Sequence, residues 1–185
     1  MKIYLVRHGE PLVDRSRRAN LLGYAKWRRS YHHAGIKPDA EKAADVARRV
    51  GGKTKYFSSD LKRAVHTAAA VIQEAEVARE KLFREMELPL VALPITAKCS
   101  SWLILSRVLW FCGFGGGGES FKQAKARVLR AVERLVAEAQ RQDVVLFGHG
   151  LMNYFIAKDL KKAGWRGSVP SRIHYWDVVV LEKNA

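Results

Sequence analysis

Two histidines occupy nearly the same local setting at opposite ends of the chain. His8 follows the short apolar run 3–6, and His149 follows the apolar run 144–147; a glycine comes after each, and Arg7 precedes the first. A neutral imidazole can act as a nucleophile or carry a proton, and a guanidinium binds phosphate through paired donors. These residue types point to chemistry on an anionic substrate.

Further candidates lie between the two histidines. Arg63 falls in the first turn of a helix that we expect to begin at Ser59 as N-cap. The free N–H groups at a helix N-terminus favour anions, so an arginine there adds to a phosphate site. Glu85 and Glu87 follow a brief apolar segment that we interpret as leading to a strand end, and either can supply a proton.

The elements that must position these side chains alternate between strands and helices. Continuous apolar runs of this length are typical of strands buried on both faces, and ligands bind at the carboxyl ends of such strands. We expect strands at 3–6, 55–58, 144–147 and 173–181. Helical periodicity or capping predicts helices that begin near Pro38 and Ser59, a long helix from the Ser120/Gln123 capping box, and one from His149 to about Lys162.

This order predicts an α/β fold: a single-domain three-layer α/β/α sandwich whose mostly parallel central sheet carries helices on both faces. The 185 residues suffice for one such domain over 1–185. Residues 89–118 break the pattern and are expected to form a variable apolar cap. Its run Trp102–Trp110, extended to Phe114, favours core or lid packing, with membrane contact or dimerisation as alternatives.

Composition limits the class of protein and the compartment that we expect. Hydrophobic residues make up 48% of the chain, which excludes a disordered protein, and no apolar run is long enough to span a bilayer. The N-terminus lacks the features of a signal peptide. Cys99 and Cys112 have neither CxxC nor metal-ligand spacing. We therefore expect a soluble cytoplasmic protein with reduced thiols.

The formal charge of +15 predicts an affinity for anions. The densest basic cluster follows the first histidine in a region interpreted as a loop, with Tyr24 and Trp27 interleaved: Arg15, Arg17, Arg18, Lys26, Arg28 and Arg29. Two interpretations are open, a solvated basic face or a surface that gathers anionic substrate.

Three motifs in order carry a family resemblance. They are Arg7-His8-Gly9-Glu10, the run Ser58-Ser59-Asp60-Leu61-Lys62-Arg63-Ala64 with Thr67-Ala68, and Gly148-His149-Gly150. Together they resemble the histidine phosphatase superfamily, which has the phosphoglycerate-mutase-like fold. The order and spacing agree over nearly the whole chain.

The resemblance implies a role for each candidate. His8 would be the nucleophile that forms a phosphohistidine, and Arg7, Arg63 and His149 would surround the phosphoryl oxygens. Glu85 would be the proton donor, because Phe83-Arg84-Glu85 is the nearest match to the family's Leu-x-Glu pattern; Glu87 is a competitor. Glu119-Ser120 resembles a Gly-Glu-Ser element, where Ser120 is a helix cap first and a site residue second. Glu10 would be a structural acid near the pocket.

The expected function is a phosphatase that hydrolyses a small phosphorylated substrate without metal or cofactor. Pro11 and Asp14 replace a frequent Thr or Ser and an Asn of the family, and the usual Gln-Gly turn is missing, so no particular substrate carries over. The region after Glu85 lacks the glycine and tryptophan pattern of the family's broad-range mutase-like phosphatases, which argues against mutase activity. One alternative is a phosphoprotein or phosphohistidine phosphatase. Another is a catalytically weak module that binds nucleic acid, which is less favoured, or acidic lipid at a membrane surface.

Overall fold

The computed structural model of the chain describes residues 1–50, 54–72, 75–116 and 118–184. Its main sheet has the strand order β4-β3-β6-β1-β7. The strands are β1 (Lys2–Arg7), β3 (Thr54–Ser58), β4 (Val77–Arg79), β6 (Asp143–Gly148) and β7 (Val178–Glu182). β4, β3, β6 and β1 pair in parallel, whereas β7 is antiparallel to β1. The predicted mostly parallel sheet is confirmed.

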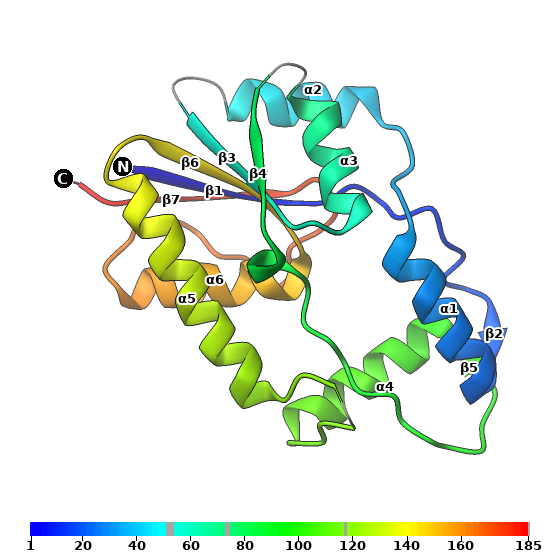
Figure 1. Cartoon of the computed structure of the whole chain (residues 1–185). Helices are drawn as coiled ribbons and strands as arrows, with labels where there is room; N and C mark the ends of the chain where they lie inside the picture. Colours follow the sequence, from blue (N-terminus) through cyan, green and yellow to red (C-terminus); the bar gives the residue numbers. More distant parts are fainter. Residues whose placement is uncertain (51–53, 73–74, 117, 185) are drawn as a thin grey trace.

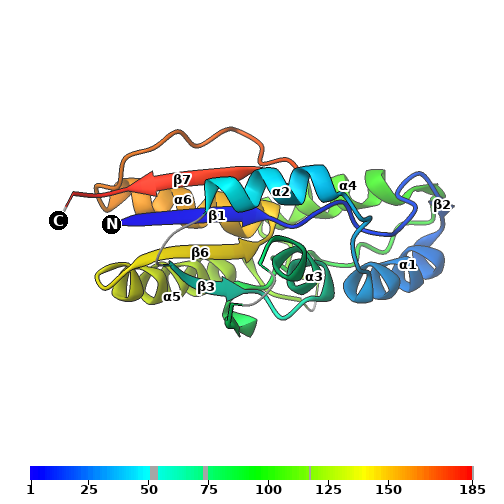
Figure 2. The ribbon, with the colours of Figure 1, turned by 90° about the horizontal axis from the view of Figure 1, so that it is seen from above.

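Helices cover both faces of this sheet (Figures 1 and 2). On one face lie α2 (Ala40–Arg49) and α3 (Lys62–Val71), and on the other lie α5 (Phe121–Ala139) and α6 (Gly150–Lys162). Ile3 and Leu5 of β1 pack toward α5 and α6, whereas Tyr4 and Val6 pack toward α2 and α3. Because successive side chains of a strand alternate between faces, one apolar run supplies both cores. The three-layer α/β/α architecture is confirmed.

A smaller lobe lies beyond the carboxyl ends of β1, β3 and β6 (Figures 1 and 2). It contains β2 (Arg18–Ala19), α1 (Leu21–His33), β5 (Ala97–Lys98) and α4 (Cys99–Phe111), with β2 antiparallel to β5. The ring of Tyr24 on α1 stacks on Trp102 of α4 with 5.3 Å between centroids. This third core therefore fixes α1 and α4 as one body facing the strand ends.

Helix α4 carries apolar side chains on its exposed face as well as on its buried face. Trp102 and Trp110 are buried, but Ile104, Val108 and Phe111 are 61%, 53% and 47% exposed. Leu103 and Arg107 of the same helix line the cavity described below. The structure thus places α4 beside the candidate site. A membrane or dimer contact through the exposed face of this helix stays a prediction. Among the described residues, no helix is both long and apolar enough for a membrane span.

Several boundaries differ from the prediction. Pro38 precedes the N-cap Asp39 of α2 and is not in its first turn. Ser59 is not a cap: its N–H donates to the Phe147 carbonyl at 3.0 Å, which keeps it extended, and α3 begins at Lys62 after N-cap Leu61. Arg63 still lies in the first turn of α3.

The segment before Glu85 and the start of the last strand were also predicted wrongly. Residues Lys81–Phe83 form the 3-10 helix η1, in which Phe83 is buried against the ring of Phe57. The last strand begins at Val178 rather than 173, because Trp176 has φ of 67° and interrupts the extended backbone.

The basic cluster is only in part a loop: Arg15 and Arg17 lie in irregular backbone and Arg18 begins β2. Lys26, Arg28 and Arg29 lie on helix α1, and the interleaved Tyr24 and Trp27 are buried in the core of the lobe. Helical spacing explains the arrangement, because residues three apart share one face while their neighbours point elsewhere.

Candidate functional site

The two histidines meet at the carboxyl edge of the sheet. Parallel pairing of β1 with β6 sets Arg7 opposite Gly148, and the backbone N–H of His8 donates to the Gly148 carbonyl at 3.1 Å. The imidazole rings of His8 and His149 lie 5.1 Å apart between centroids, edge to face. The sheet topology therefore brings together the two residues whose settings are alike in sequence.

The tautomer of His8 follows from its hydrogen bonds. Nδ1 lies 2.7 Å from the Gly9 carbonyl, and because a carbonyl only accepts, Nδ1 carries the proton. Arg63 Nε donates to the other nitrogen, Nε2, at 3.3 Å. Burial, aided by the positive charge of Arg63, holds the pKa of His8 well below its usual range. His8 is therefore a neutral imidazole with a lone pair on Nε2 that faces a guanidinium.

Arg63 is held by contacts from two helices. Its Nη1 donates to the Tyr31 carbonyl at 3.2 Å, and its guanidinium lies 4.7 Å from the centroid of the Tyr31 ring. Within α3, Thr67 Oγ1 donates to the Arg63 carbonyl at 2.6 Å and accepts the Gly9 N–H at 2.9 Å. This hydroxyl thus joins α3 to the turn after β1 and fixes Arg63 relative to His8.

Arg7 is oriented by the loop before β7. Its guanidinium lies 4.2 Å from the centroid of the Tyr175 ring, and its Nη1 donates to the Ile173 carbonyl. Arg15 donates to the Tyr175 hydroxyl at 2.8 Å, and the Tyr175 ring lies 5.5 Å from that of His8. One tyrosine therefore positions two arginines beside the imidazole.

His149 is fully buried at the start of α6, where it is the N-cap residue. Neither ring nitrogen has a hydrogen-bond partner among the described residues. Burial, followed by the charge of Arg63, holds the pKa of His149 well below its usual range. A buried ring nitrogen normally has a partner, so this imidazole is free to bond a ligand beside His8.

Glu85 lies at the N-terminus of α6. Its Oε1 accepts the Met152 N–H at 3.0 Å, and its Oε2 accepts the Leu151 N–H at 3.3 Å. A carboxylate satisfies the free amides of a first helical turn and interacts well with the helix dipole. Because α6 begins directly after His149, these bonds hold Glu85 and His149 in one unit.

Arg127 of α5 fixes the segment that carries Glu85. Its Nη1 donates to the carbonyls of Leu82 and Arg84 at 3.0 and 2.7 Å. Its Nε and Nη2 donate to both oxygens of Glu119 at 2.7 and 2.6 Å. The acidic residue of the Glu119-Ser120 pair thus supports the site through Arg127, whereas Ser120 caps α5 as predicted.

Two glycines permit the close packing of these elements. A Cβ on Gly9 would lie 2.6 Å from the indole of Trp176, and one on Gly148 would lie 2.2 Å from Asn153 Oδ1. Asn153 in turn donates to the Val6 carbonyl at 3.1 Å. Any larger residue at either glycine would therefore push apart the loops that carry the histidines.

A cavity of about 390 Å³ opens between the strand ends and the α1/α4 lobe. Arg7 and Arg63, which lie beside the histidines, line it, whereas the buried His8 and His149 do not. Arginines dominate its charged lining: Arg7, Arg15, Arg28, Arg29, Arg63, Arg84 and Arg107. Two acids also line it, Glu85 and the exposed Glu87. The cavity is thus strongly electropositive and has the size of a site for a small molecule.

The structure places the remaining candidates elsewhere. Glu10 is exposed and forms an ion pair with Lys37 at 2.8 Å, and neither Glu10 nor Ser120 lines the cavity. No sequence motif pointed to Tyr31, Tyr175 or Arg127 as site residues. Their roles depend on long-range packing. The one related signal in the sequence is that aromatic residues alternate with basic ones in the stretch just before Tyr31.

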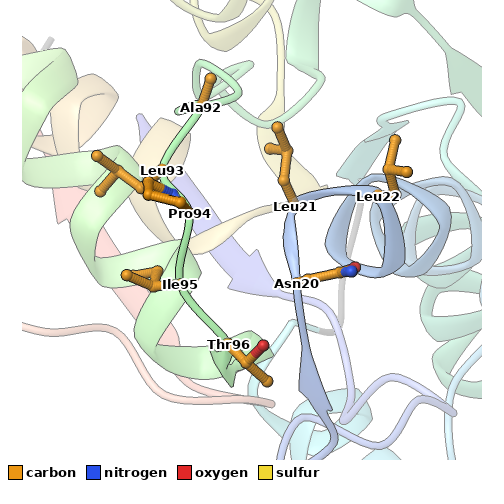
Figure 3. Close-up of a pocket in the computed structure, with 8 residues that line it drawn as sticks. All are labelled: Asn20, Leu21, Leu22, Ala92, Leu93, Pro94, Ile95 and Thr96. Atoms are coloured by element: carbon orange, nitrogen blue, oxygen red, sulfur yellow. The ribbon is translucent and has the colours of Figure 1, made fainter.

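A second hollow, of about 470 Å³, lies away from these residues between the start of α1 and the segment 92–96 (Figure 3). It has no charged side chain in its lining, which consists of Asn20, Leu21, Leu22, Ala92, Leu93, Pro94, Ile95 and Thr96. The lining contains no titratable side chain that could activate the Thr96 hydroxyl, so this hollow carries no catalytic constellation.

The two buried histidines predict a loss of stability in mild acid. Because the pKa values of His8 and His149 are lowered by folding, the unfolded chain binds more protons as the pH falls below about 6.5. The free energy of unfolding should then fall by at most about 1.4 kcal/mol per pH unit for each histidine. Melting temperatures measured from pH 8 to 5 should decline from about pH 6.5.

Variants assign this decline to the buried rings. His149→Gln should reduce the slope by about half, since His8 keeps its own contribution, whereas His33→Gln, at an exposed position on α1, should keep the full slope. A wild-type melting temperature that is level between pH 6.5 and 5.5, where carboxylates contribute little, would contradict the prediction.

Comparisons with known proteins agree with this geometry. No curated protein matches the sequence. Among solved structures, the fold is similar to phosphoglycerate mutase from Thermus thermophilus (24% identity, TM-score 0.64, covering 97% of this chain and 92% of that one). It is also similar to the alpha-ribazole phosphatase from Shigella flexneri (18%, 0.66, 100% and 91%) and to a mycobacterial glucosyl-3-phosphoglycerate phosphatase (20%, 0.65, 99% and 90%).

These structural likenesses support the fold. The sequence model of the histidine phosphatase superfamily, branch 1, matches residues 3–184, which is nearly the whole chain. The family resemblance inferred from the three motifs is thus confirmed. The chain belongs to the histidine phosphatase superfamily.

Proposed function

We propose that this protein is a phosphatase that hydrolyses small phosphate monoesters through a phosphohistidine on His8. The observation that carries the proposal is the defined state of this imidazole. Its Nδ1 is bonded to the Gly9 carbonyl, and its Nε2 lone pair faces Arg63 at 3.3 Å. Arg63 in turn lines a cavity rich in arginine, so the guanidinium lies between this nitrogen and the cavity. A neutral, oriented nitrogen beside phosphate-binding cations is what nucleophilic attack on phosphorus requires.

In the first step, Nε2 of His8 attacks phosphorus, so that an N–P bond forms and the ester P–O bond breaks. Arg7, Arg63 and His149 bind the equatorial oxygens and stabilise the charge spread over them. Arg63 exchanges its bond to Nε2 for one to a phosphoryl oxygen. Its second anchor, on the Tyr31 carbonyl, keeps the guanidinium in place during this exchange.

The leaving alkoxide takes a proton from Glu85, which then accepts a proton from the water that attacks the phosphohistidine. The N–P bond breaks, inorganic phosphate forms, and His8 returns to its neutral state. Glu85 is favoured over Glu87 because its carboxyl group is fixed on the first turn of α6, next to His149. Glu87 lines the same cavity but is exposed, without an ion pair among the described residues.

The cavity favours a small substrate over a phosphoprotein. Its volume of about 390 Å³ and its walls from α1 and α4 suit an ester of the size of a metabolite. The positive charge of the lining also attracts anionic esters, and it should therefore raise their rate of association.

The direct test is turnover of 4-nitrophenyl phosphate and a panel of alkyl phosphates, followed by release of inorganic phosphate. Within the described residues, no three His, Cys, Asp or Glu side chains are grouped as a metal site. The assay therefore includes an arm with excess chelator, in which we expect undiminished turnover. Absence of hydrolysis across the panel, or a requirement for added metal ion, would contradict the proposed function.

A further inference from the structure

The cavity contains more cationic groups than one phosphoryl group requires. Arg7 and Arg63 lie beside the histidines, and Arg84 is neutralised by Asp60, which accepts two bonds of 2.6 Å from it. Arg15 is engaged by the Tyr175 hydroxyl. Three arginines of the α1/α4 lobe are left after these assignments.

These three are Arg28 and Arg29 on α1 and Arg107 on α4. None has an ion pair or a side-chain hydrogen bond within the part of the chain that the structure describes. The Nε of Arg107 is moreover buried without a partner. Elsewhere the protein does supply acids to arginines, as in the pairs Arg127–Glu119 and Arg134–Glu80.

Two of the unpaired arginines lie on packed helices and line the same cavity. α1 and α4 pack through the stack of Tyr24 on Trp102, and Arg28 and Arg107 leave this interface toward the same cavity. Burial raises the pKa of Tyr24, and Ser106 and the positive charges of Arg28 and Arg107 partly offset the rise. Like charges that line one cavity repel, so an anion bound between them would stabilise the arrangement.

We propose that Arg28 and Arg107, with Arg29 at the rim, form a second anion site in the same cavity. Resting on the proposed function, this identifies the substrate as a phosphate monoester that carries a second anionic group, a phosphate or a carboxylate. The reacting phosphoryl group lies beside His8, and the second group binds between α1 and α4. A bidentate fork suits both oxyanions, and the arginine pair therefore selects charge at a distance from the ester.

Binding of non-hydrolysable probes tests the second site without requiring turnover. Isothermal titration at about physiological ionic strength, where weak surface attraction is screened, compares three probe types with wild-type protein. They are propylphosphonate, α,ω-alkane bisphosphonates with three to six methylenes, and the matching ω-phosphonocarboxylates. At least one doubly anionic probe should bind at least about tenfold more tightly than propylphosphonate. The arm with the tighter binding identifies the second group as phosphate or carboxylate.

Variants assign the preference to the arginine pair. R28Q/R107Q should bring the affinity ratio of doubly to singly anionic probes close to one. R130Q removes one positive charge from an exposed position of α5 outside the cavity, and it should keep the wild-type ratio. If the double variant does not fold, as judged by circular dichroism, R29Q at an exposed position should still show a smaller loss of the ratio.

The outcomes separate this inference from the proposed function. No preference in the wild type, a preference that survives R28Q/R107Q, or an equal loss in R130Q would each overturn the second site. Hydrolysis of alkyl phosphates can still be observed in those cases. Conversely, a preference that depends on Arg28 and Arg107 would establish the second site even if no ester in the panel is hydrolysed. If the protein has both the second site and phosphatase activity, kcat/KM for the matching alkane bisphosphate esters should exceed that for propyl phosphate. The factor should be about the ratio of the probe affinities.

Discussion

Replacing His8 with alanine is expected to lower kcat for phosphate monoesters by at least about a thousandfold, because removing a catalytic nucleophile abolishes the covalent route. The side chain is buried and its Nε2 is the nitrogen that faces Arg63. Water held by the remaining cations is a poorer substitute, because Glu85 must give its proton to the leaving group in that step and therefore cannot accept the proton of the attacking water. The measurement is steady-state release of phosphate from 4-nitrophenyl phosphate and from an alkyl phosphate.

The matched control is His33→Ala, which removes an exposed imidazole at the end of α1 and should keep wild-type turnover. Rapid quenching of the wild type into base should reveal a phosphoramidate, which acid removes. Peptide mass spectrometry should locate this phosphoryl group on His8. Turnover by His8→Ala at the wild-type rate, or a phosphoryl group on another residue, would contradict the mechanism.

Glu85→Gln is expected to reduce turnover of alkyl phosphates by about 10²–10⁴-fold, the usual contribution of general acid catalysis. The loss should be much smaller for 4-nitrophenyl phosphate, because 4-nitrophenolate is a good leaving group even without a proton. The amide is isosteric and leaves the segment that Arg127 fixes in place. It does exchange one acceptor for a donor beside the Leu151 and Met152 amides, at a cost of about 1 kcal/mol.

Glu87→Gln is the matched control, since it removes the second acid of the same cavity. It should change kcat by less than about twofold for either ester, because an exposed side chain with no fixed partner does not orient a proton. Equal losses for both leaving groups in Glu85→Gln would indicate a structural role. A larger loss in Glu87→Gln would instead make Glu87 the proton donor.

The two tests examine different atoms of one reaction. The first concerns the bond to phosphorus, and the second concerns the proton on the departing oxygen. A variant that forms the phosphohistidine on His8 but does not turn over would indicate that attack by water is impaired, whereas transfer from the ester is not. Single-turnover kinetics separates these steps.

Much of the fold could be predicted because its signals are local. The apolar runs at β1 and β6, the capping box at Ser120 and the periodicity of α5 each depend on neighbours in the chain. Predictions failed where a distant partner decided the backbone. Ser59 stays extended because its N–H bonds Phe147, and Phe83 forms a 3-10 turn as its ring packs on Phe57.

By itself, the sequence determined that Arg7, His8, Arg63 and His149 converge. Residues at the carboxyl ends of neighbouring parallel strands and at the helix starts that follow them must share one edge of the sheet. It also indicated an affinity for anions, although a formal charge of +15 does not say where on the surface an anion binds.

Only the tertiary structure decided how those groups are oriented and what surrounds them. The attachment of Glu85 to α6, the stacking of Arg7 on Tyr175 and the shared cavity lined by Arg28 and Arg107 bring together residues that lie tens to more than a hundred positions apart. Such contacts form only when separate cores pack against one another, and no periodicity or local propensity encodes them. The physical reason is that burial and side-chain direction, which fix a proton or a charge, are properties of the assembled layers.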